Sequence, residues 1–129
     1  MIRARALQVV LVLVGLVFTA AVYPVAMDLW RGDASDTGDT MMMSLYFTLG
    51  IFLLLAVCNP SAHRSVIAFA AWSSFAHAVV MSALGFQPKF VSERAGFWGG
   101  SAVLVVIGVI LIALAPPKPS RELASAPVA

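Results

Sequence analysis

The imidazole of His77 is the side chain in this sequence that is best placed to do chemistry. It lies at the middle of residues 65–88, a stretch that contains no Asp, Glu, Lys or Arg. If that stretch crosses a membrane, His77 lies near the bilayer centre, where ionisable side chains are rare and usually functional. A charged imidazolium would be costly in hydrocarbon. We therefore expect a neutral ring that faces the other helices and hydrogen-bonds a neighbour.

Four other polar side chains are candidate neighbours of His77. Ser73 and Ser74 precede it by four and three residues, so on a helix they lie on the same side. Tyr46 and Thr48 belong to the preceding apolar stretch, in its outer half. This set is a candidate for binding a ligand or relaying a proton. The interpretation that the sequence favours makes His77 only a hydrogen-bonding contact between helices, which in membranes contributes about 0.6 kcal/mol on average.

This sequence contains few side chains that could coordinate a metal ion or a haem iron. His63 lies about 21 Å from His77 along a helix axis, so a haem held by two histidines of one chain is disfavoured. Met81 together with His77 is a weak candidate pair for Cu(I), which prefers soft ligands. The single cysteine, Cys58, excludes zinc sites built from several thiolates. We predict no metal site and no catalytic residue, and the cofactor stays unknown.

The composition indicates the elements that position His77. Of the 129 residues 61% are hydrophobic and 11% are charged, against roughly 25% charged in an ordinary globular chain. Four stretches, 6–27, 40–62, 65–88 and 95–117, contain no Asp, Glu, Lys or Arg. Each exceeds the roughly 20 residues that cross a bilayer as a helix. A secretory signal peptide is the alternative for the first stretch, but its apolar run continues to Met27.

We therefore predict an all-α integral membrane protein with one domain, an antiparallel bundle of four transmembrane helices over residues 1–117. The expected spans are about 7–27, 41–57, 65–84 and 96–115, and a disordered tail follows at 118–129.

Lysine and arginine counts favour cytoplasmic termini, by five residues to three. The five inner residues are Arg3, Arg5, Arg64, Lys118 and Arg121, and the three outer ones are Arg31, Lys89 and Arg94. The opposite orientation is the alternative. Because the basic residues flank apolar stretches, the expected partner is the lipid bilayer and not nucleic acid.

Small residues recur at helical spacing on the third and fourth predicted spans. Such rows let membrane helices approach closely. They serve packing within one chain or association into a homo-oligomer or a larger membrane complex, and the sequence leaves both open. The predicted packing residues are Ala70, Ser74, Ala78 and Ser82 on the third span and Gly96, Gly100 and Gly108 on the fourth.

Two short motifs stand out, NPxxHRS at residues 59–65 and WSSxxHA at residues 72–78. In the first, Asn59 can cap a helix, Pro60 fits a first helical position, and His63 with Arg64 forms the inner anchor of the third span. The second begins at Trp72 and contains His77. With these motifs the chain resembles an uncharacterised family of small four-helix bacterial integral membrane proteins. The resemblance implies a location in the bacterial cytoplasmic (inner) membrane, and it implies no activity.

Two functions of different classes follow from the sequence. The first is a non-enzymatic accessory or scaffold protein, or a subunit of a larger complex. The alternative is a membrane protein centred on His77 that binds a metal, a haem or a lipophilic, quinone-like ligand, or that is redox-active. Motifs of hydrolases, kinases and dinucleotide-binding enzymes are absent, which favours a protein that is not an enzyme. A small proton-coupled antiporter ranks third, because no carboxylate lies inside the four stretches.

Overall fold

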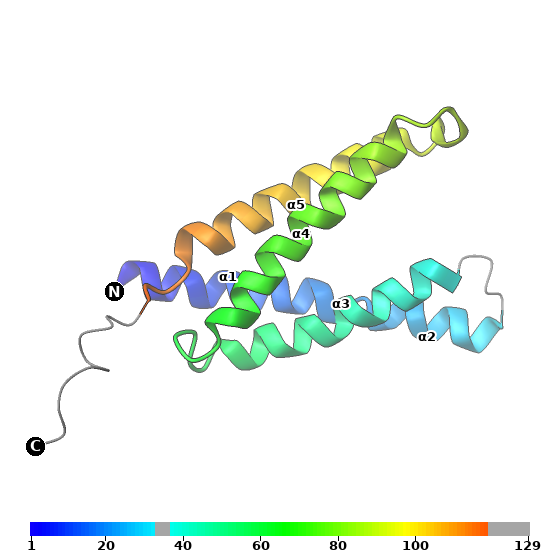
Figure 1. Cartoon of the computed structure of the whole chain (residues 1–129). Helices are drawn as coiled ribbons and strands as arrows, with labels where there is room; N and C mark the ends of the chain where they lie inside the picture. Colours follow the sequence, from blue (N-terminus) through cyan, green and yellow to red (C-terminus); the bar gives the residue numbers. More distant parts are fainter. Residues whose placement is uncertain (33–36, 119–129) are drawn as a thin grey trace, which may run out of the picture.

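The computed structural model describes residues 1–32 and 37–118, and these residues form helices and short connections (Figure 1). Helices α1 and α2 follow one another almost without interruption and form one apolar segment of 30 residues. This segment and three further helices are each long and apolar enough to cross a membrane. The elements are α1 (Ile2–Thr19), α2 (Val22–Arg31), α3 (Thr37–Ala56), α4 (Arg64–Gly85), η1 (Pro88–Phe90) and α5 (Arg94–Leu114).

Pro24 accounts for the interruption between α1 and α2. Proline has no N–H group and its ring collides with the carbonyl group four residues earlier, here that of Ala20. The chain makes a turn at Ala20 and Ala21, and the N–H of Tyr23 bonds to the carbonyl of Ala20 at 3.0 Å. The first predicted span, 7–27, is therefore two helices that together reach further at both ends.

The connection between α3 and α4 differs from the prediction for the NPxxHRS motif. Asn59 does not cap α4, because its Oδ1 accepts the N–H of Ala62 at 3.3 Å and closes a turn. Pro60 lies in the same turn, where its carbonyl accepts the N–H of His63 at 3.3 Å. His63 is the N-cap of α4, which begins at Arg64. The tail predicted to be disordered, 118–129, lies outside the described residues except for Lys118.

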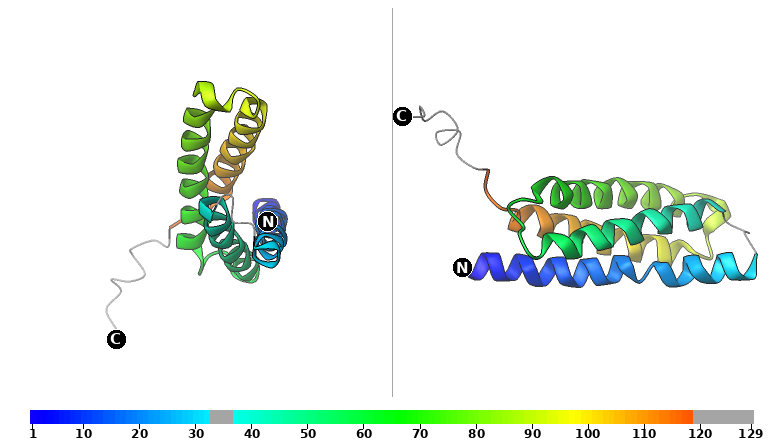
Figure 2. Two further views of the ribbon diagram at one scale, coloured as in Figure 1. Left: turned by 90° about the vertical axis from the view of Figure 1, so that its right-hand side faces the viewer. Right: turned by 90° about the horizontal axis from the view of Figure 1, so that it is seen from below.

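The helices associate as two pairs, α1 with α3 and α4 with α5 (Figures 1 and 2). Where α3 passes into α4 the two pairs lie close together, and towards η1 they diverge (Figure 1). Leu11, Leu53, Ile67 and Leu111 are fully buried in one core. These four leucine and isoleucine side chains come from α1, α3, α4 and α5, so all four long segments meet in this core.

Polar side chains cap helix ends near the same core. The guanidinium of Arg3 donates hydrogen bonds to the carbonyls of Ala113 and Ala115 at the end of α5, at 2.9 and 3.2 Å. The amide of Gln8 donates to the carbonyl of Val57, just after α3, at 3.2 Å. The last carbonyls of a helix have no partner within it, so these contacts satisfy groups that would be costly in an apolar environment.

Small residues bring α4 and α5 together. Ala70, Ser74 and Ala78 are at most 2% exposed. The hydroxyl of Ser101 on α5 donates to the carbonyl of Ala78 at 2.8 Å and lies 2.6 Å from the hydroxyl of Ser82. A row of small residues thus packs within the chain, as the spacing allowed.

The glycines of α5 take part in this contact unequally. A Cβ atom on Gly108 would lie 2.7 Å from the ring of Phe75, and one on Gly100 would lie 2.7 Å from the terminal methyl of Met81. Gly96 was expected to pack in the same way, but a Cβ atom there meets no heavy atom within 4 Å. The contact therefore uses Gly100 and Gly108 and not Gly96.

The α1–α3 pair depends on Gly50. A Cβ atom at this position would lie 2.5 Å from the backbone nitrogen of Thr19 and 2.8 Å from the carbonyl oxygen of Gly15. Backbone atoms cannot move aside as a flexible side chain can, so any larger residue must push α1 away from α3.

We predict that Gly50→Ala lowers the free energy of unfolding by about 1–3 kcal/mol, the usual cost of overpacking. The measurement is denaturation of the purified protein in detergent micelles, followed by circular dichroism. Gly99→Ala is the matched control, because Gly99 is also helical and a Cβ atom there meets open space. Equal stability of the two variants would contradict the close approach of α1 and α3 at Gly50.

Candidate functional site: the groove between α3 and α4

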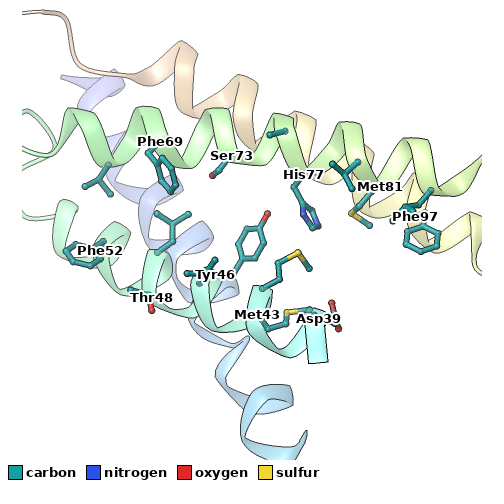
Figure 3. A pocket seen from close by; sticks show the side chains of 18 of the residues that line it. Asp39, Met43, Tyr46, Thr48, Phe52, Phe69, Ser73, His77, Met81 and Phe97 are labelled. Atoms are coloured by element: carbon teal, nitrogen blue, oxygen red, sulfur yellow. The ribbon is translucent and has the colours of Figure 1, made fainter. Parts of the chain in front are cut away.

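The divergence of the two helix pairs opens a groove between α3 and α4 with a volume of about 1150 Å³ (Figure 3). We call it the α3–α4 groove. Its lining comes from one face of α3, one face of α4, and residues around the start of α5. Most of the lining is aromatic or aliphatic, for example Tyr46, Phe52, Phe69, Val80, Met81 and Phe97.

His77 and Tyr46 face each other across this groove (Figure 3). Their ring centroids lie 5.4 Å apart, with the ring planes at 77°. Tyr46 in turn packs edge to face on Phe18 of α1, with a centroid distance of 4.9 Å. Because Phe18 is only 6% exposed, this series of rings connects His77 to the core of the α1–α3 pair. Tyr46 is thus the neighbour of His77 from α3, and the two meet as rings.

Two further residues of the predicted set line the groove. The hydroxyl of Ser73 donates to the carbonyl of Ala70 at 3.1 Å, and that of Thr48 donates to the carbonyl of Ser44 at 3.0 Å. Both hydroxyls bond to their own helix, as serine and threonine often do in apolar surroundings. Each oxygen keeps the capacity to accept a hydrogen bond from a molecule in the groove.

Ser74 does not line the groove with His77. Its side chain is fully buried, and its hydroxyl donates to the carbonyl of Ala70 at 2.7 Å. At 100° per residue, Ser73 and Ser74 lie on opposite sides of the line through His77, about 40° and 60° away. The side of α4 that carries Ser73 faces the groove, and the side that carries Ser74 is buried in the contact with α5.

Asp39 and Glu93 line the groove, although both lie outside the predicted spans. Helix α3 begins at Thr37, four residues before the predicted span, so Asp39 lies in its first turn. The spacing of Asp39, Met43 and Tyr46 matches one face of a helix, and this was the available signal. Because Asp39 is charged, it falls outside a span that is defined by the absence of charge. The carboxylate of Asp39 lies close enough to His77 for a Coulombic interaction between the two side chains.

The remaining motif residues lie at the groove's closed end or on the outer surface. Arg64 starts α4, and one of its guanidinium nitrogens, Nη1, is buried without a hydrogen-bond partner. Ser65, the last residue of NPxxHRS, lines the groove. Trp72 is 66% exposed and packs edge to face against Phe75, with centroids 5.7 Å apart.

The chemistry that the groove can perform is recognition of a polar group inside an apolar channel. Tyr46 and a neutral His77 can each donate and accept a hydrogen bond. Met81 also lines the groove, beside His77 on the same helix. Among the described residues, no three or more His, Cys, Asp and Glu side chains lie close enough together to hold a metal ion. The arrangement suits an amphipathic organic molecule.

We predict that the rings of Tyr46 and His77 are coupled by about 0.5–1.5 kcal/mol, the usual value for an edge-to-face pair. The measurement is a double-mutant cycle of Tyr46→Leu and His77→Leu, read as unfolding free energies in detergent. The control cycle combines His77→Leu with Tyr23→Leu, because Tyr23 is 70% exposed on α2. A coupling no larger than in the control would refute the ring contact.

Comparison with known proteins gives a family and no activity. No curated protein and no solved structure matches the chain. One family model does match, and it covers residues 2–120, which include all the helices described above. The chain therefore belongs to the family of unknown function DUF6632.

Proposed function

We propose that this protein binds an elongated lipophilic molecule in the α3–α4 groove, with His77 and Tyr46 contacting the polar end of that molecule. The observation that carries the proposal is the groove itself, about 1150 Å³ with a largely apolar lining and a few polar side chains around His77. Ligand sites in proteins typically combine such an apolar wall with a small number of polar groups that fix orientation.

The lining restricts the ligand to amphipathic molecules. An entirely apolar occupant would leave the polar atoms of His77 without hydrogen bonds, and unsatisfied buried polar groups are costly. A strongly polar occupant would lose its hydration against the phenylalanine and valine side chains without compensation. A quinone-like head group on an apolar chain is one chemistry that meets both conditions.

The scaffold function suggested by the sequence loses its main support. That interpretation relied on rows of small residues that would contact another subunit. Ala70, Ser74 and Ala78 are buried within the chain instead, so they are not free for a partner. Ligand binding is therefore the function that the geometry supports best.

We predict that Ala76→Phe weakens binding of triphenylphosphine oxide by about tenfold or more. This probe is neutral and lipophilic, and it carries one strong hydrogen-bond acceptor. Ala76 lines the groove, so a phenyl group there fills it, and overpacking of about 1–3 kcal/mol corresponds to a factor of about 5–150. Equilibrium dialysis against the protein in neutral maltoside micelles measures the affinity.

Val79→Phe is the matched control for Ala76→Phe. Val79 lies on the same helix but is 68% exposed and does not line the groove. A third variant, His77→Phe, keeps a ring of similar size and removes its hydrogen-bonding atoms, so it should weaken the probe by roughly 2- to 10-fold. Equal affinities of Ala76→Phe, Val79→Phe and the wild type would reject ligand binding in the groove.

The proposal also includes the placement of the protein. We infer an antiparallel arrangement of four spans in a bacterial cytoplasmic membrane, with both termini in the cytoplasm. Supporting this, Arg3, Arg5, Arg64 and Lys118 flank the helix ends that would face the cytoplasm. The acidic residues Asp28, Asp39 and Glu93 flank the opposite ends. Basic residues are enriched on the cytoplasmic side of membrane proteins.

We predict that a membrane-impermeant maleimide labels Cys58 in bacterial spheroplasts only after the membrane is permeabilised. Cys58 is exposed and follows α3, at the end proposed to face the cytoplasm. It is the chain's single cysteine, so the wild type needs no background removal. The control, Cys58→Ser with Gln87→Cys, places the thiol at the other end and should be labelled without permeabilisation. The reverse pattern would invert the proposed orientation.

A further inference from the structure

We propose that the α3–α4 groove selects a lipophilic cation over a neutral or anionic molecule of the same shape. This inference rests on the proposed ligand-binding function and specifies its ligand class. It is argued from the charged and aromatic residues that line the groove and from the cations that lie near it.

The charged side chains that line the groove, within the described part of the chain, are both carboxylates. Asp39 comes from the first turn of α3, and Glu93 is the N-cap residue of α5. They therefore belong to the two different helix pairs, and both lie at the end where the pairs diverge. A cation in the groove is attracted by both carboxylates, whereas an anion is repelled by both.

Of the three basic residues at the same end, Arg31, Lys89 and Arg94, the last two have contacts of their own. The ammonium of Lys89 lies over the ring of Phe90, 4.9 Å from its centroid. The Nε of Arg94 donates to the carbonyl of Gly85 at 2.8 Å, at the end of α4. Neither residue lines the groove. Lys89 nevertheless lies beside the groove through Phe90, so its charge works against a bound cation.

Aromatic faces add a second source of cation attraction. Phe90 and Phe97 line the groove near Glu93, and their rings pack edge to face at 5.4 Å. In Figure 3, Phe97 lies beside Met81, and Asp39 lies on the opposite side of the groove, at the start of α3. The faces of aromatic rings attract cations, most strongly where water is excluded. The contact of Lys89 with Phe90 is an example of this attraction within the chain.

The remaining lining decides which kind of cation fits. Beyond the carboxylates the groove is bounded by apolar side chains such as Val80, Leu84 and Phe52. A small, strongly hydrated cation would lose its hydration there. A cation whose charge is shielded by aryl or alkyl groups keeps favourable contacts along the whole groove. The ligand class is therefore an organic cation with a large apolar surface.

The test compares two ions of the same size and opposite charge, tetraphenylphosphonium and tetraphenylborate. Binding to the purified full chain in neutral maltoside micelles is measured by equilibrium dialysis, and protein-free micelles are subtracted. We expect the wild type to bind the phosphonium more tightly than the borate. The double variant Asp39→Asn, Glu93→Gln should lose about tenfold or more in phosphonium affinity and narrow the difference between the two ions.

Two further single variants serve as controls, one expected to raise the phosphonium affinity and one expected to leave it unchanged. Lys89→Gln should raise phosphonium affinity, which damage to the fold would not do. Asp28→Asn removes a carboxylate at the same end of the molecule that does not line the groove, and the residue keeps an oxygen for its 2.9 Å bond from Thr40. It should leave the affinity within about twofold of the wild type, since a charge outside the groove is largely screened.

The outcomes separate this inference from the proposed function. A double variant that binds the phosphonium within twofold of the wild type would overturn the inference, as would a wild type that prefers the borate. Triphenylphosphine oxide is the neutral reference and reports on an intact groove in each variant. One outcome is that Ala76→Phe weakens binding of the neutral probe, while the carboxylate variants leave the phosphonium affinity unchanged. In that case only the cation preference is refuted. If Ala76→Phe leaves the neutral probe unchanged, the proposed function fails as well.

Discussion

The close packing of α4 on α5 is the constraint on which the other features depend. It brings a row of small residues against the second helix and joins the two through Ser101, whose hydroxyl bonds to the carbonyl of Ala78. This contact fixes the rotation of α4 about its axis. Once Ser74 and Ala78 face α5, Ser73 and His77 lie about 100° further round the helix, on the side of α3. The position of the candidate site thus follows from the packing of small residues that lie outside it.

The second determinant is that the helix pairs share a core at one end only. Leu11, Leu53, Ile67 and Leu111 close the structure beside the turn between α3 and α4. Towards η1 the pairs separate, and the aromatic series Phe18, Tyr46 and His77 crosses the space between them. The groove is consequently narrow where the core lies and wide where the carboxylates lie. A molecule with an apolar chain and a cationic head matches that order.

Much of this architecture could be predicted from the sequence, because membrane helices carry a strong signal. Charge-free stretches locate four helices, and the spacing of Ala70, Ser74 and Ala78 indicates a packing face. The positions of helix ends carry a weaker signal. The predicted second span begins at residue 41, so Asp39 was not expected in the groove. Which of Ser73 and Ser74 accompanies His77 depends on tertiary packing, since helical spacing alone permits both.

Because the helix pairs share a core at one end only, the distance between their other ends depends strongly on the angle between the pairs. Helix α4 has 22 residues and is therefore about 33 Å long. Rotating the α4–α5 pair by about 10° around its anchored end would displace the far end by about 6 Å, while the buried leucines hardly move. A small change in the angle between the helix pairs therefore changes the width of the groove most where Asp39 and Glu93 lie. The turn at residues 57–63, closed by Asn59, lies at the anchored end, so its geometry sets the width of the groove.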